Sequence, residues 1–110
     1  MTARLGDLDD PDYPAYTTGR AAEVLGVQQA FLRALDTAGA VTPQRTAGGR
    51  RRYNRRQLVF AARIRELFDQ NLTLAAALRI LALEDDLTTE RALTARLHEQ
   101  LAGRDRQDER

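Results

Sequence analysis

The chain has 110 residues, of which 43% are hydrophobic and 30% are charged, and its net charge at pH 7 is +1. This length fits one small domain and argues against a multidomain enzyme with separate cofactor and substrate lobes. The absence of cysteine excludes disulfides, zinc ribbons and thiol nucleophiles. No apolar run approaches the roughly 20 residues that cross a bilayer, and the acidic N-terminus lacks the pattern of a secretory signal. We therefore expect a globular cytoplasmic protein.

The charged residues are unevenly distributed along the chain. Residues 1–15 carry one arginine and four aspartates, residues 16–65 carry ten arginines and two acidic residues, and residues 66–110 carry six arginines and ten acidic residues. The small net charge therefore hides a middle stretch of +8, which is typical of a nucleic-acid-binding face. Every basic residue is arginine, which suits phosphate and guanine. GC-rich coding DNA also replaces lysine by arginine, so this bias alone identifies no ligand.

The first part of the chain predicts two short helices joined by a tight turn. Residues 1–15 are expected to form a flexible acidic arm. Thr17 and Thr18 are suited to cap a helix that ends at Gly26. A second helix follows from the helical spacing of apolar residues, with Gly39 at its C-terminal cap. Two short helices around a glycine-containing turn indicate a helix-turn-helix.

A small β wing and a third helix are predicted next. Residues 40–53 read as two short strands around a turn at Thr46–Gly49. Asn54 can cap the following helix, and Gln57 completes a capping box. Apolar residues at helical spacing extend this helix to about Gln70. The predicted fold is mainly α with a small β wing.

The C-terminal third predicts two further helices. Thr73 caps the first, which is expected to end at Asp85 and Asp86 because negative charge at a helix C-terminus opposes the helix dipole. The second is expected to begin at Thr88 or Thr89. The predicted organisation is an N-terminal arm (1–15), a winged helix-turn-helix domain (16–86), a short C-terminal helix for dimerisation or another partner (87–102) and a charged tail (103–110).

A winged helix-turn-helix places its second helix in the DNA major groove and its wing on the backbone or the adjacent minor groove. The amides of a threonine-capped helix can bind phosphate, glutamine can pair with adenine, and arginine can pair with guanine or phosphate. Because side chains alternate along a strand, Arg51 should point away from Arg50 and Arg52. The predicted DNA-binding residues are Thr17, Thr18, Gln28, Gln29, Arg33, Arg45, Arg50, Arg51, Arg52 and Tyr53.

These residues also have purely structural interpretations. The wing arginines could belong to a solvated loop, and Arg33 to the solvated face of a helix. Tyr53 could pack beneath the wing as readily as its hydroxyl could contact a phosphate. The sequence shows no nucleophile and base pair, phosphate-cradling loop or metal cluster, so we predict no enzyme activity, no metal and no cofactor.

Several short motifs occur together in residues 16–81. They are Y-T-T-G from Tyr16, V-x-x-x-x-L-R from Val27, then Asp36, Gly39 and Pro43, G-x-R-R-Y from Gly49 to Tyr53, and L-T-L from Leu72. In this order they resemble the DNA-binding domain of the MerR family of bacterial transcription regulators. The segments TAGGRRRY and NLTLAAALRILALED are most similar to the heat-shock repressor branch. The resemblance implies a winged helix-turn-helix regulator that binds double-stranded DNA in the nucleoid.

The sequence departs from the family pattern in the second helix. Ala34 and Leu35 stand where members commonly carry two aromatic residues, which removes a DNA-contacting tyrosine. Gln28 stands where members often have a capping serine, which leaves that helix start less well fixed. Metal-sensing members use cysteines, and drug-sensing members append a further domain. The resemblance therefore implies a regulator without its own small-molecule receiver.

The resemblance also implies a homodimer, because family members pair a C-terminal helix in an antiparallel coiled coil. The corresponding stripe here consists of Leu87, Leu93, Leu97 and Leu101, with Leu83 upstream. A helix of about 14 residues is marginal alone and must pack on something, and we favour a second copy over the helix folding back on its own domain. Two other functions remain open: an adaptor that binds a transcription-machinery partner, and an excisionase-like architectural DNA-binding protein.

Overall fold

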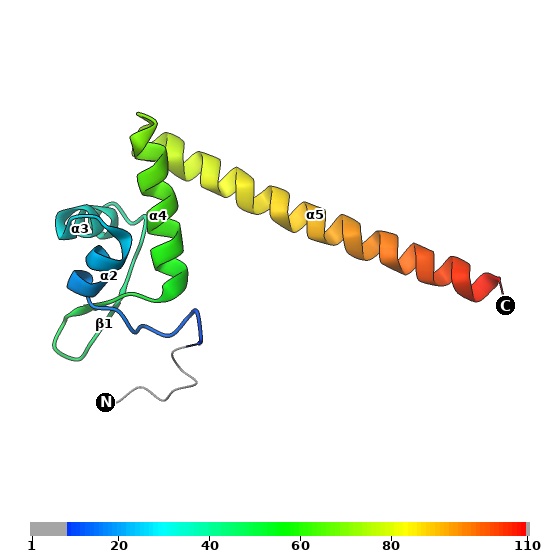
Figure 1. The fold of residues 1–110 in the computed structure, drawn as a ribbon, viewed down its shortest axis with the longest axis horizontal. Helices are drawn as coiled ribbons and strands as arrows, with labels where there is room; N and C mark the ends of the chain where they lie inside the picture. The colour runs from blue at the N-terminus through cyan, green and yellow to red at the C-terminus, as the bar shows by residue number, and fades with distance from the viewer. Residues whose placement is uncertain (1–8, 110) are drawn as a thin grey trace. The chain divides into compact units, whose positions relative to one another are not determined.

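The computed structural model describes residues 9–109. They form two compact units, one ending at Leu72 and one beginning at Thr73, which are described separately below. The architecture is mainly helical with a two-stranded antiparallel wing, which confirms the predicted fold class (Figure 1). In the described part of the chain, no helix is both long and apolar enough to cross a membrane.

The first unit begins with the predicted helix pair. Helix α2 (Thr18–Leu25) is capped by Thr17, whose Oγ1 accepts a hydrogen bond from the Arg20 amide at 3.0 Å. It ends at Gly26, whose φ of 67° is the left-handed conformation that glycine adopts without strain. Helix α3 (Gln29–Thr37) packs against α2 but has no side-chain cap at Gln28, as its sequence predicts.

The wing and helix α4 follow. Strands β1 (Gln44–Arg45) and β2 (Arg51–Arg52) pair antiparallel, with Gln44 opposite Arg52 and Arg45 opposite Arg51. An isolated bridge between Tyr16 and Tyr53 ties the segment before α2 to the wing. Helix α4 (Arg55–Asp69) begins with the predicted capping box, in which the side chains of Asn54 and Gln57 each accept the other's backbone amide.

The core of the first unit lies among these elements. Tyr53, Leu32, Leu35 and Ile64 are its largest fully buried side chains. They come from the wing, α3 and α4, so burying them fixes these three elements relative to one another. Leu35 therefore serves the core, and Ala34 beside it is exposed.

Helix α5 (Leu74–Asp108) corrects the predicted C-terminal third. It is one helix of 35 residues, drawn from yellow to red in Figure 1, where the sequence predicted a break at Asp85 and Asp86, a short helix and a tail. Thr73 is its N-cap as predicted, but Thr88 lies inside it and donates its hydroxyl to the Glu84 carbonyl at 3.0 Å. Threonine makes this bond within helices, so here it does not mark a helix start. The segment has no proline, so two aspartates are too weak a signal to end it.

The described end of the N-terminal arm is attached to α4, which differs from the predicted flexible arm. The Arg55 guanidinium donates to the Asp9 carbonyl at 2.7 Å, and Arg56 pairs with Asp12 at 2.8 Å. The Arg56 amide, which has no partner inside α4, donates to the Pro11 carbonyl. Residues 1–8 of the predicted arm lie outside the described residues.

Candidate nucleic-acid interface

An open hollow of about 430 Å³ brings together most of the predicted DNA-binding residues. Its walls come from the start of α2, the exposed side of α3 and the wing. The lining residues are Thr17, Thr18, Gly19, Gln29, Arg33, Arg45, Gly49, Arg50, Arg51 and Arg52. Five of these residues are arginines and none is acidic, so the basic hollow, as we call this surface, is suited to a polyanion.

The start of α2 supplies hydrogen-bond donors to the basic hollow. Among the described residues, the amides of Thr18 and Gly19 have no acceptor, because they belong to the first helical turn. Both residues line the hollow. The positive end of the helix dipole lies at the same place, which favours an anionic oxygen there.

The wing turn shapes the opposite side of the basic hollow. Gly49 has a φ of 82°, a conformation that strains other residues. Thr46 closes the turn by accepting the Gly49 amide on its carbonyl and the Arg50 amide on its hydroxyl. Arg50 follows directly and is exposed, so the turn presents its guanidinium to solvent.

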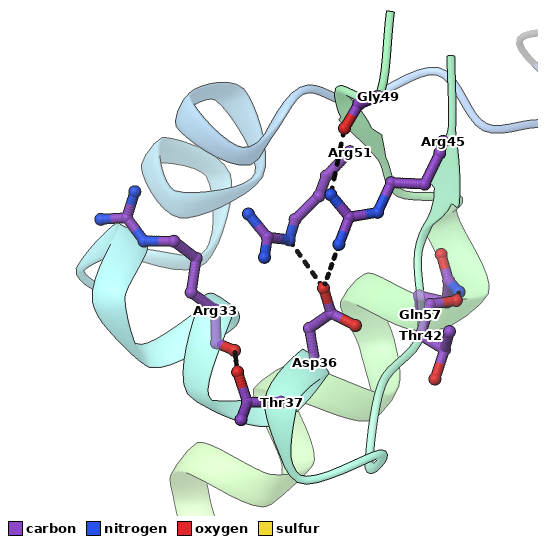
Figure 2. A network of polar contacts seen from close by, with 8 residues as sticks. All are labelled: Arg33, Asp36, Thr37, Thr42, Arg45, Gly49, Arg51 and Gln57. Carbon is purple, nitrogen blue, oxygen red and sulfur yellow. Dashed lines mark hydrogen bonds and ion pairs between the residues drawn. The ribbon is translucent and has the colours of Figure 1, made fainter. Parts of the chain in front are cut away.

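The arginines of the basic hollow fall into two groups. Arg45 and Arg51 both donate to Asp36 Oδ2, at 3.1 and 2.7 Å (Figure 2). Arg33, Arg50 and Arg52, in contrast, have no ion-pair partner within residues 9–109, and Arg52 donates only to the neighbouring Arg51 carbonyl at 3.0 Å. Of the three neighbouring arginines Arg50, Arg51 and Arg52, Arg51 is the one that reaches Asp36. All three line the basic hollow, so the predicted alternation of their side chains stays a prediction.

Tyr53 lies beneath the wing, which is the packing interpretation left open by the sequence. Its side chain is fully buried, so we leave it out of the interface. Burial raises the pKa of its hydroxyl, and the nearby Thr18 side chain and the charge of Arg51 oppose this in part. The Thr18 contact does not reach the geometry of a hydrogen bond, so the hydroxyl is unsatisfied within residues 9–109.

Gln28 also lies away from the basic hollow. It lines a different hollow of about 510 Å³ that runs from the turn after α2 to Arg65 of α4. Phe31 borders this second hollow and packs edge-to-face on Phe68, with ring centroids 5.8 Å apart. The Arg65 guanidinium sits 5.7 Å from the Phe31 ring centre. This second surface is partly aromatic and holds one arginine.

Sequence reasoning missed two features of the interface. Asp36 was named only as part of the family motif and no contact was predicted for it, although it is one of just two acidic residues in the basic stretch 16–65. An acidic residue among so many arginines is expected to form an ion pair, and this pattern could have indicated the role of Asp36. Gly19 is the other omission, and a Cβ at this position would lie 3.4 Å from Gln29 Nε2. This is an ordinary contact distance, so Gly19 belongs to the interface through its backbone amide and its place in the lining of the hollow.

The predicted partner residues lie on α5. Leu83, Leu87, Leu93, Leu97 and Leu101 are between 43% and 57% exposed, which is high for large apolar side chains. They form the largest set of exposed leucines in the described chain. Exposed apolar side chains grouped in this way are typical of an interaction surface, so the partner role of these leucines stays a prediction.

Comparisons with known proteins agree with this architecture. The model of the MerR HTH family of regulatory proteins matches residues 16–84. A Streptomyces coelicolor protein named "Putative heat shock protein HspR" is 36% identical over 93 residues, which make up 84% of this chain and 62% of that protein. The chain thus spans less than two thirds of this relative's length. A crystal structure of a MerR-family transcriptional regulator from Bacillus cereus has a TM-score of 0.56 at 20% identity, covering 79% of this chain and 72% of that one, which supports the fold alone.

Proposed function

The chain belongs to the MerR HTH family, whose members are DNA-binding transcription regulators and not enzymes. From this premise we propose that the basic hollow is the DNA-binding surface and that α3 enters the major groove. The wing then lies on the backbone or the adjacent minor groove. In this proposal the protein acts as a homodimer on nucleoid DNA in the cytoplasm.

The observation that carries the DNA-binding mode is the convergence of three kinds of donor in the basic hollow. Amides at Thr18 and Gly19 suit a phosphate oxygen, and Arg50 suits the backbone or minor groove. Gln29 and Arg33 lie on α3 and can read base edges. Ala34 offers no ring for a DNA contact, so base reading rests on these two side chains.

The exposed leucines of α5 support the homodimer. Leu83, Leu87, Leu97 and Leu101 share one helical face with Glu90 and Thr94, because the six positions alternate steps of four and three residues. This is the a and d spacing of a two-stranded coiled coil. Leu93 lies at the edge of the same face.

The order of residues along this seam favours antiparallel pairing. Leu83 and Leu101 lie equally far from Ala92, as do Leu87 and Leu97, and Glu90 and Thr94. Two antiparallel copies centred on Ala92 would therefore pair leucine with leucine and Glu90 with the partner's Thr94. Parallel copies would instead place Glu90 against the partner's Glu90, and two carboxylates at a seam repel.

The DNA-binding proposal is tested by fluorescence anisotropy with a 30-bp duplex enriched from a random pool by the wild-type protein. A scrambled duplex of equal composition and a single strand serve as controls. We expect preference for the enriched duplex and an affinity that falls steeply with salt, because phosphate contacts release counterions. An equal affinity for both duplexes, together with bending of the DNA, would support an architectural DNA-binding protein. If no duplex bound and a transcription-machinery protein did, the adaptor function would replace ours.

A further inference from the structure

Asp36 occupies an unfavourable position in α3. It lies in the last turn of the helix, next to the final residue Thr37, where the helix dipole disfavours a negative charge. Its side chain is only 13% exposed, so it is also largely withdrawn from water. A carboxylate placed in this way needs positively charged partners. The wing provides two.

The two partners of Asp36 come from different strands. Arg45 is on β1 and Arg51 on β2, and the register places them directly opposite each other. Both donate to the same oxygen, Oδ2, as Figure 2 shows. One carboxylate of the recognition helix α3 therefore holds both strands of the wing.

The contact continues from Asp36 to the tip of the wing. Arg45 uses its second nitrogen, Nη1, to donate to the Gly49 carbonyl at 3.0 Å. Gly49 borders the basic hollow beside Arg50. A chain of polar contacts thus runs from α3 through Asp36 and Arg45 to the turn that presents Arg50 (Figure 2).

Asp36 also determines which arginines are free to bind a ligand. Arg51 is only 26% exposed and Arg45 49% exposed, and both are engaged by the carboxylate. Arg33, one turn earlier on α3, extends away from Asp36 (Figure 2). Two arginines of the basic hollow are therefore held by Asp36, while Arg33, Arg50 and Arg52 form no ion pair within the described chain.

We propose that Asp36 is a positioning residue for DNA discrimination. This proposal rests on the proposed DNA-binding function. By fixing the wing to α3, Asp36 sets the spacing between the group that contacts the backbone and the side chains that read bases. By neutralising part of the charge of Arg45 and Arg51, it also limits sequence-independent binding to phosphate.

The test compares Asp36→Asn with Glu23→Gln. Each removes one negative charge from the basic stretch, but Glu23 lies on the exposed side of α2 and forms an ion pair with Arg20 of the same helix at 3.0 Å. The probes are the enriched and scrambled 30-bp duplexes. We expect Asp36→Asn to bind the scrambled duplex several-fold more tightly, because the released arginines can reach phosphates. The salt slope, which is the slope of log affinity against log salt concentration, should become steeper by about one or two.

The decisive quantity is the ratio of the affinity for the enriched duplex to the affinity for the scrambled duplex. We expect it to fall about tenfold in Asp36→Asn and to stay unchanged in Glu23→Gln, since a uniform charge effect acts on both duplexes alike. An unchanged ratio and slope in Asp36→Asn would overturn the proposal, as would the same change in Glu23→Gln. If the wild-type protein enriched no duplex, the proposed function itself would fail.

A second variant keeps the proposal testable if Asp36→Asn does not fold. Arg51→Met removes one wing contact of Asp36 and keeps much of the apolar stem. We expect it to lower the affinity ratio with a small change in salt slope, because the charge of Arg51 is already engaged. Arg50→Met serves as the comparison for the loss of one phosphate contact. If Arg51→Met made the salt dependence of affinity as much shallower as Arg50→Met does and left the affinity ratio unchanged, Arg51 would simply contact phosphate and the proposal would be contradicted.

Discussion

The winged unit and α5 use their apolar residues in opposite ways. In the winged unit, Leu32 and Leu35 of α3, Tyr53 of the wing, and Leu58, Ile64 and Leu67 of α4 are buried, and five arginines line the basic hollow. In α5, every leucine from Leu83 onward is exposed. The winged unit therefore has its own core and offers a polar surface, whereas α5 exposes an apolar stripe that the proposed dimer would bury.

The largest expected effect is on the α5 surface. Leu97→Asp would place a carboxylate against a leucine at two symmetric points of the proposed seam. We expect the dimer dissociation constant to rise at least 100-fold, about 2.7 kcal/mol, while the winged unit stays folded. Sedimentation measures the change, and Ala95→Asp on the far side of the helix is the control. An intact Leu97→Asp dimer would place the seam elsewhere.

The next effect tests the polar surface of the winged unit. Arg50→Ala removes an arginine with no ion-pair partner in the described chain, and we expect duplex affinity to fall about tenfold near 0.1 M salt. The salt slope should become shallower by about one, the value for one phosphate contact. Arg96→Ala, on α5, is the matched control. If both variants behaved alike in anisotropy titrations, the wing would not be part of the interface.

Glu90→Leu sharpens the proposed register of α5. It replaces the acidic residue of the seam with leucine, so we expect a dimer about tenfold tighter, or about 1.4 kcal/mol. Glu99→Leu, which lies off the seam, should leave the dissociation constant nearly unchanged. Sedimentation over a concentration series compares them. A weaker Glu90→Leu dimer would contradict the antiparallel pairing centred on Ala92.

The smallest effect concerns the core beneath the wing. Burial raises the pKa of Tyr53 above its ordinary value of about 10, so above that pH the unfolded chain loses this proton before the folded protein does. The Tyr53 contribution to stability is therefore complete below pH 10 and falls as the pH rises further. We expect Tyr53→Phe to change stability by less than about 1 kcal/mol at pH 8 and to lose less stability than wild type at pH 11. Urea unfolding at both values would contradict this account if the two proteins lost equal stability.

Local signals predicted the winged unit well. Thr17, Gly26 and the Asn54–Gln57 box act at single helix ends, so each could be recognised from a few neighbouring residues. The basic hollow was also largely predictable, because most of its lining residues were among the expected DNA-binding residues. Gln28 and Tyr53 were the exceptions, since burial and the direction of a side chain depend on how the helices pack.

Two features depended on longer-range effects. The length of α5 was underestimated because Asp85, Asp86 and Thr88 were interpreted as local end signals, and helix propensity summed over the whole segment outweighs them. The role of Asp36 depends on residues 9 and 15 positions away in the sequence. Its partners become visible only once the wing folds back on α3.

Amide chemical-shift mapping shows which surface of the protein DNA contacts. The ¹⁵N-labelled protein is titrated with the enriched 30-bp duplex. If DNA binds the basic hollow, we expect the largest changes at Thr18, Gly19, Gln29, Gly49 and Arg50, with small changes from Leu83 to Leu101. Largest changes on the leucine stripe of α5, or around Phe31 and Arg65 in the second hollow, would contradict it.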